Sequence, residues 1–106
     1  MQKTKAAILL PKWDRNKRPI EGAKFSQTYD EIYEQFGGCT IDFSPLLGSW
    51  FNKKTQKRDE DRLISYWVVY DDNYSNMYFL DEMKEKLKQW FGQDEIFMYS
   101  YLINVF

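Results

Sequence analysis

Two helix-type segments, each ended by glycine and followed at once by a strand-type segment, constrain the fold of this chain most. In residues 26–36, the apolar residues recur at the spacing of one helical face, and they are Phe25, Tyr29, Ile32, Tyr33 and Phe36. Gly37 and Gly38 end this helix because glycine readily adopts the left-handed conformation that follows a helix. Thr28 and Glu31 have the spacing of a capping box, and Ser26 is an alternative cap.

The second helix-type segment is predicted from Asn76 to Phe91, with Gly92 as its stop. Its inward residues are Leu80, Met83, Leu87, Trp90 and Phe91. Asp71 and Asp72 come shortly before it, and adjacent carboxylates there either cap the helix and form the turn or bind Mg²⁺. Capping is the favoured interpretation.

Four segments have strand character. Residues 5–10 are nearly all apolar, as expected of a central strand covered on both faces. Residues 39–43 alternate, and Ser44-Pro45 predicts a bulge or bend before residues 46–51 continue. Residues 62–72 and 95–106 follow, both rich in aromatic and β-branched residues.

The predicted order is strand, helix, strand, strand, helix, strand, which is the ferredoxin-like βαββαβ pattern. The sequence therefore predicts an α+β fold with a four-stranded antiparallel sheet and two helices on one face. Its 106 residues suffice for a single domain, residues 1–106.

Two helices cover only one face of such a sheet, yet the predicted strands carry large residues on both faces. Tyr66, Trp67, Tyr99 and Tyr101 cannot all lie under the helices, because neighbouring strand residues face opposite sides. An exposed aromatic patch usually marks an interface or a ligand site. We expect a homodimer packed sheet to sheet; a base-stacking platform for single-stranded RNA is the alternative.

Composition narrows the classes of function. Fifteen basic and sixteen acidic residues give a net charge of −1, which disfavours binding to duplex DNA. The chain has no histidine and only one cysteine, Cys39, so histidine-based acid–base catalysis, a disulfide within the chain and a Cys/His zinc site are excluded. We expect no cofactor and no metal. The sequence shows neither a signal peptide nor a membrane span, which predicts a soluble, cytoplasmic protein.

The loop after the first strand is the most suggestive candidate site, with four cations beside an indole: Lys12, Trp13, Arg15, Lys17 and Arg18. Such residues hold phosphates and stack a base. The alternative is a solvated basic loop with Trp13 folded over the core.

A second charged stretch, residues 53–62, mixes five cations with three anions, as is typical of a solvated hairpin tip. Arg62 begins the next strand on the face of Ile64 and Tyr66, from which it is expected to reach the open face of the sheet. A lone arginine there either pairs with a carboxylate or contacts a ligand.

The segments "FGGCTIDFSPLLGSW", "DRLISYWVVYDD" and "WFGQDEIFMYSYLINVF" resemble a class of small bacterial and phage proteins of unknown function with a Phe-Gly-Gly…Gly-x-Trp pattern. The resemblance covers residues 5–105. The matching residues are structural in character: Phe36, Gly37, Gly38, Gly48 and Trp50. Less specifically, the chain resembles small dimeric ring nucleases, which degrade cyclic oligonucleotide messengers of antiviral defence.

Taken together, the residues and the resemblance suggest a small anionic ligand, such as a cyclic oligonucleotide, bound at a dimer interface. Cleavage would be that of a metal-independent phosphodiesterase. The phosphate and base contacts would come from Lys12, Trp13, Arg15, Lys17, Arg18 and Trp50. Arg62, Ser49 and Tyr66 would orient or stabilise the reacting group. The alternative is a non-catalytic protein-interaction module, a phage or defence regulator that uses the open sheet face.

Overall fold

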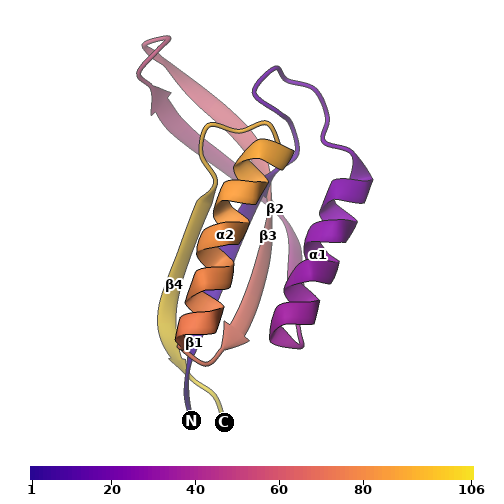
Figure 1. The fold of residues 1–106 in the computed structure, drawn as a ribbon. Helices are drawn as coiled ribbons and strands as arrows, with labels where there is room; N and C mark the ends of the chain where they lie inside the picture. The colour runs from indigo at the N-terminus through magenta and orange to yellow at the C-terminus, as the bar shows by residue number, and fades with distance from the viewer.

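The computed structural model describes all residues 1–106, and its six elements follow the predicted order (Figure 1). These elements are β1 (Gln2–Pro11), α1 (Gly22–Phe36), β2 (Thr40–Asn52), β3 (Lys57–Tyr70), α2 (Tyr74–Trp90) and β4 (Phe97–Asn104). The sheet has the order β2-β3-β1-β4, and every neighbouring pair is antiparallel. The predicted ferredoxin-like α+β fold is confirmed.

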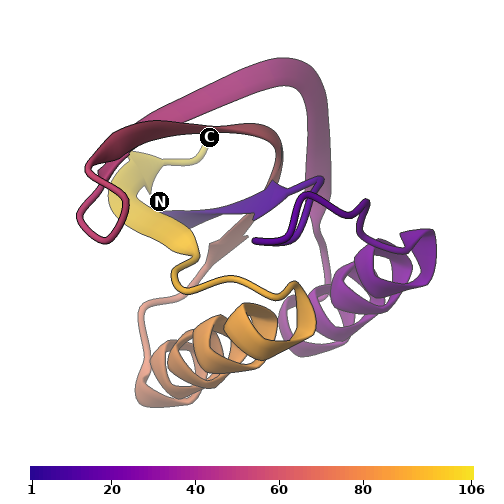
Figure 2. The same cartoon turned by 90° about the horizontal axis from the view of Figure 1, so that it is seen from above.

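Both helices lie on one side of the sheet, and the core fills the space between these layers (Figure 2). The buried residues come from alternate positions of the two inner strands and from the inward faces of the helices: Ala6, Ile8, Leu10, Tyr66, Val68, Tyr70, Ile32, Leu80, Met83 and Leu87. Strand β1 is an inner strand of the sheet, and Ala7 on its open face is 2% exposed like the core residues on its other face, which explains its nearly continuous apolar sequence.

The first helix ends as predicted but begins earlier. Gly37 has φ 76°, and its N–H donates to the Tyr33 carbonyl at 2.7 Å. The helix starts at Gly22 after Glu21, whose side chain makes no cap. Thr28 is buried in mid-helix and donates to the Lys24 carbonyl at 2.7 Å. The predicted caps at Ser26 and Thr28 are therefore wrong, because tertiary packing extends the helix past them.

The β2–β3 pair continues well beyond the rest of the sheet. Its register shifts between Asp42 and Leu46, where the sequence predicted a bulge at Ser44-Pro45. Only residues 53–56 form the turn, since the Asn52 carboxamide accepts from the N–H groups of Lys54 (2.9 Å) and Thr55 (3.2 Å). The charges from residue 57 onward thus lie on a strand. We call residues 47–62 the hairpin, which projects past the end of β1 (Figure 1).

The sheet face opposite the helices carries exposed aromatic rings, as predicted. Tyr99 and Tyr101 remain 45% and 49% exposed, and their rings stack with centroids 6.3 Å apart. Both flank β1, opposite Ala7 and Lys5. The Lys5 ammonium lies 4.1 Å from the centroid of the Trp67 ring on the same face. The chain's own segments therefore leave much of this face uncovered.

Neither helix has the combination of length and hydrophobicity needed to cross a bilayer.

The cap of α2 gives a direct test of the fold. The Asn73 carboxamide accepts from the Asn76 N–H at 2.9 Å, whereas Asp71 pairs with Lys3 at 2.6 Å. Asn73→Ala should lower the free energy of unfolding by about 1 kcal/mol, because one helix N–H loses its acceptor. Urea denaturation measures this loss. Asp72→Ala is the matched control and should cost less; an equal loss in both variants would contradict the assignment.

Candidate functional site

The loop between β1 and α1, residues 12–21, is folded back on itself by one carboxylate. Oδ1 of Asp14 accepts from the backbone N–H of Asn16 at 2.8 Å and from that of Arg18 at 3.0 Å. The hydrogen bond from Arg18 is the main cause that lowers the pKa of Asp14. Lys17 completes the turn: its N–H donates to the Asp14 carbonyl at 2.9 Å, and its φ is 63°.

The loop between α2 and β4, residues 91–96, is docked onto this first loop. The Arg15 N–H donates to the Gly92 carbonyl at 3.1 Å, and the Gln93 carboxamide donates to the Trp13 carbonyl at 2.7 Å. The Arg15 guanidinium also pairs with Asp94 at 2.9 Å. Gly92 has φ 60°, and a Cβ there would lie 3.1 Å from Cβ of Asp14. Glycine thus permits both the turn and the close approach of the two loops.

On the hairpin, Gly48 accommodates the indole of Trp50. A Cβ at Gly48 would lie 2.9 Å from Cζ3 of Trp50 and 3.0 Å from Cδ1 of Leu63. The missing side chain therefore lets the ring lie across the strand, which explains the Gly-x-Trp spacing physically. Asp59 faces Trp50 across the strand pair and accepts from the Asn52 carboxamide at 2.8 Å.

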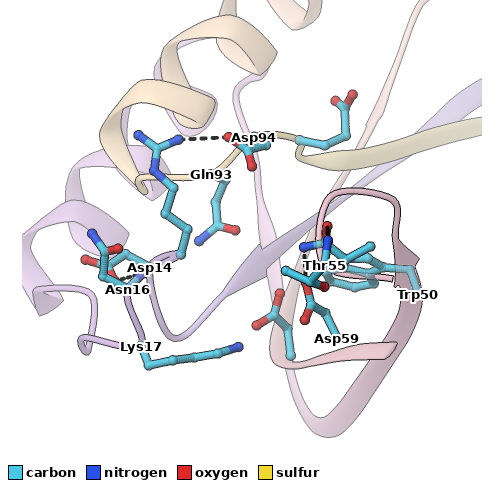
Figure 3. Close-up of a pocket in the computed structure, with 12 residues that line it drawn as sticks. Asp14, Asn16, Lys17, Trp50, Thr55, Asp59, Gln93 and Asp94 are labelled. Carbon is cyan, nitrogen blue, oxygen red and sulfur yellow. Dashed lines mark hydrogen bonds and ion pairs between the residues drawn. The ribbon is translucent and has the colours of Figure 1, made fainter. Parts of the chain in front are cut away.

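These three segments surround a cleft of about 400 Å³, which we call the tip cleft (Figure 3). It is lined by Asp14, Arg15, Asn16, Lys17, Trp50, Asn52, Thr55, Asp59, Asp61, Gln93, Asp94 and Glu95. Five carboxylates face two cations, so the lining has a net charge of −3. An adjoining, much smaller hollow connects Trp50 and Asp61 to Phe97 at the end of the open sheet face.

Asp61 is the carboxylate with the most unusual environment in the tip cleft. Burial raises its pKa, the ammonium of Lys17 acts in the opposite direction, and the nearby charge of Asp59 raises it further. A carboxylate that is only partly compensated favours the approach of a positively charged group.

A second cleft of about 350 Å³ lies between the first loop and the hairpin, and it brings together some of the predicted residues. Its lining is Trp13, Lys17, Leu47, Glu60, Asp61 and Arg62. Lys17 and Asp61 line both clefts, so the two are continuous around this pair.

The predicted ligand-binding residues are thus divided. Arg15, Lys17 and Trp50 line the tip cleft, while Trp13 lies only on the second one. Lys12 and Arg18 line neither. Arg18 lies 4.0 Å from the Asp14 carboxylate, and Lys12 is exposed.

The predicted catalytic residues do not form one group. Arg62 shares the strand face of Tyr66, as expected, but this face turns toward the helices and not toward the open side. Tyr66 is 3% exposed, and its hydroxyl donates to the Phe25 carbonyl of α1 at 3.2 Å. Burial raises the pKa of Tyr66 to about 12. Ser49 is exposed on the hairpin opposite Glu60. The expectation that all three act together is wrong, because the helices cover Tyr66.

Sequence reasoning missed nine of the twelve residues that line the tip cleft, among them Asp61, Gln93 and Glu95. The sequence did contain a signal for Asp61. It lies two residues before Leu63, so in a strand both side chains are on the same face, the open face of the sheet. Gln93 directly follows Gly92, and Glu95 lies two residues further on, in a loop of the kind that often serves a site. Nothing in the sequence alone placed either of them beside the hairpin.

The raised pKa of Asp61 predicts a pH-dependent effect on stability. The folded state binds the Asp61 proton more tightly than the unfolded state does. The contribution of Asp61 to the free energy of unfolding is therefore most favourable below its ordinary pKa, and it declines as the pH rises through the pKa of the folded state. Asp61→Asn should therefore raise the free energy of unfolding at pH 7, and its advantage should shrink toward pH 4.

Urea denaturation across this pH range measures the effect. Asp81→Asn, at an exposed position of α2, is the matched control and should show little change. A destabilised Asp61→Asn variant at pH 7 would contradict the prediction, since it would show that the fold stabilises the charge.

Comparisons with known proteins identify the fold. No family model matches the chain, and no curated protein matches it by sequence. A solved structure of a phage SAM lyase in complex with S-methyl-5'-thioadenosine is similar, with a TM-score of 0.71 and 8% sequence identity. The match covers 97% of this chain and 90% of that chain. At this identity the likeness concerns the fold alone.

The prediction of a phosphodiesterase for cyclic nucleotides is wrong. The similar solved structure is a lyase with a thioadenosine ligand, and the tip cleft carries an excess of negative charge where phosphates were expected. Arg15 and Arg18 do not supply free positive charge, because both lie beside carboxylates, Asp94 and Asp14. The ring-nuclease resemblance itself stays a prediction. The chain shares its overall architecture with a phage SAM lyase.

Proposed function

We propose that the chain binds S-adenosylmethionine (SAM) in the tip cleft and degrades it as a lyase. The observation that carries this proposal is the acidic cleft beside the exposed indole of Trp50. SAM combines a positively charged sulfonium with an adenine ring, so it fits both features. The fold shared with a SAM lyase supports the same ligand class.

Charge favours a cationic ligand here. At about 4 Å and an effective dielectric constant of roughly 20, two unit charges interact by about 4 kcal/mol. Asp59 and Asp61 both line the cleft from β3, and the environment of Asp61 already disfavours an uncompensated carboxylate. A sulfonium would compensate the negative charge of Asp61, whereas a phosphate would add a repulsive negative charge beside it.

Trp50 supplies the surface for the adenine. Trp50 is 46% exposed although its ring packs on Gly48, so one part of the residue is held and another is free. Stacking of a base on such a ring contributes roughly 1–3 kcal/mol and needs no particular hydrogen-bond pattern. The nearby Thr55 is a polar side chain suited to the edge of a base, whereas the Asn52 carboxamide is already hydrogen-bonded to the turn and to Asp59.

The chemistry requires no histidine. In the proposed reaction a carboxylate oxygen of SAM attacks its own Cγ, so that a C–O bond forms and the C–S bond breaks. The electron pair goes to sulfur, which leaves as neutral methylthioadenosine, and homoserine lactone is the other product. No base, external nucleophile or water takes part. This suits a chain without histidine whose one thiol, Cys39, has its pKa raised to about 11 by burial.

The charge change divides the roles of the residues. The positive charge on sulfur is lost as the C–S bond breaks, so the carboxylates stabilise bound SAM more than the transition state. The acceleration must then come from alignment of the carboxylate with Cγ, for which well-oriented intramolecular reactions have large effective molarities. The acids therefore govern KM, and the shape of the cleft governs kcat.

Incubation of the protein with SAM, followed by mass spectrometry, tests the proposal. Methylthioadenosine and homoserine lactone should appear, whereas hydrolysis would yield homoserine directly. Trp50→Ala and Asp61→Asn should each raise KM by about tenfold, the loss of one stacking contact or one charge pair.

Glu82→Gln, at an exposed acid of α2 outside the cleft, is the matched control and should behave as the wild type. SAM that stays intact and unbound at millimolar concentration would contradict the proposal. Cleavage that is insensitive to both Trp50→Ala and Asp61→Asn would place the site elsewhere.

We also propose that a second copy of the chain covers the open sheet face. Phe97, Tyr99 and Tyr101 form a continuous row of exposed rings there, with centroids 5.8 and 6.3 Å apart. Burial of apolar surface contributes about 25 cal/mol per Å², which favours covering such a row. Phe97 also borders the hollow beside the tip cleft, so a second copy would narrow the site from that side.

Light scattering tests this association. The solution mass should exceed the 12.9 kDa of one chain, and Tyr99→Glu should reduce it to that value, because a charge in the row opposes burial. Tyr33→Glu, on an exposed part of α1, is the control and should retain the association. A wild-type mass of one chain at assay concentration would contradict it.

A further inference from the structure

We infer that Lys17 is the residue by which the tip cleft selects S-adenosyl compounds that retain the α-carboxylate of methionine. This inference rests on the proposed function and names the substrate class within it. It is carried by the position of Lys17 at the junction of the two clefts, both of which it lines.

Of the two cations that line the tip cleft, Arg15 and Lys17, only Lys17 has a free charge. The Arg15 guanidinium is paired with Asp94 at 2.9 Å, and Arg18 lies beside Asp14 at 4.0 Å. The Lys17 ammonium makes no ion pair or hydrogen bond, and its charge acts on Asp61 only at longer range. An anionic group of a ligand can therefore bind it without breaking an existing pair.

The backbone aims this side chain across the cleft. Lys17 has φ 63°, a conformation that residues with a Cβ seldom adopt, and the hydrogen bonds to Asp14 maintain it. From there the side chain extends toward the hairpin and the side of Asp59 (Figure 3). Lys17 is thus the one free cation that the first loop contributes to the lining of the tip cleft, opposite the carboxylates of β3.

This distribution of charge matches SAM and not its decarboxylated form. SAM has two cations, the sulfonium and the ammonium, and one carboxylate, so its net charge is +1. Decarboxylated SAM keeps the adenine, the sulfonium and an ammonium, and its net charge is +2. If only the acidic lining mattered, the more positive compound would bind more tightly. If Lys17 contacts the α-carboxylate of SAM, SAM binds more tightly than its decarboxylated form.

Calorimetry with the full chain tests the inference, with SAM, decarboxylated SAM and methylthioadenosine as the three ligands. The wild type should bind SAM about tenfold more tightly than decarboxylated SAM, the effect of one charge-assisted contact. Lys17→Asn, which tolerates a positive φ, should reverse this order, and Lys17→Arg should retain it. Binding of uncharged methylthioadenosine should change by less than about twofold in Lys17→Asn, since it depends on stacking.

Lys54→Met is the charge-matched control, because Lys54 lies at the exposed turn of the hairpin and lines neither cleft. It should keep the wild-type order of affinities. If Lys17→Asn still prefers SAM, or if the wild type prefers decarboxylated SAM, the inference is overturned while SAM binding and cleavage stand. If the wild type binds none of the three ligands, the proposed function fails and the inference with it.

Discussion

The hydrogen bonds accepted by the Asp14 carboxylate are the interaction on which the rest of the site depends. They fold the first loop so that Lys17 faces the hairpin and Arg15 meets the loop after α2. Gly92 then allows the second loop to approach Asp14 closely. If these contacts were absent, the first loop would be the solvated basic loop that its sequence also allows, and the tip cleft would lack one side.

The hairpin supplies the opposite wall and decides the sign of the charge. Residues 57–62 have strand pairing, so alternate side chains point to opposite faces, and Asp59 and Asp61 join Trp50 at the tip cleft. The basic residues of the first loop do not balance them, since Arg15 and Arg18 lie beside acids of their own. The lining of the tip cleft is therefore acidic and holds one free lysine, Lys17, although the chain as a whole is almost evenly charged.

The fold could be predicted almost completely, because its signals are local. Helix ends at Gly37 and Gly92 follow from the left-handed conformation, and the apolar run of β1 reflects the burial of side chains on both faces of this inner strand. The start of α1 could not be predicted, since packing against the sheet extends it beyond its capping residues. Of the predicted site residues, Arg15, Lys17 and Trp50 lie together at the tip cleft, but Tyr66 lies under α1.

By itself, the sequence determined the order of the elements, the exposed aromatic face and the absence of histidine chemistry, all of which depend on residue type and short-range spacing. Only the tertiary structure decided which charges remain free. Asp61 and Lys17 are 44 positions apart in the chain, and Arg15 and Asp94 are 79 apart. Coulomb interactions depend on distance in space, so the polarity of the cleft, and with it the class of ligand that we propose, arises only when these segments are brought together.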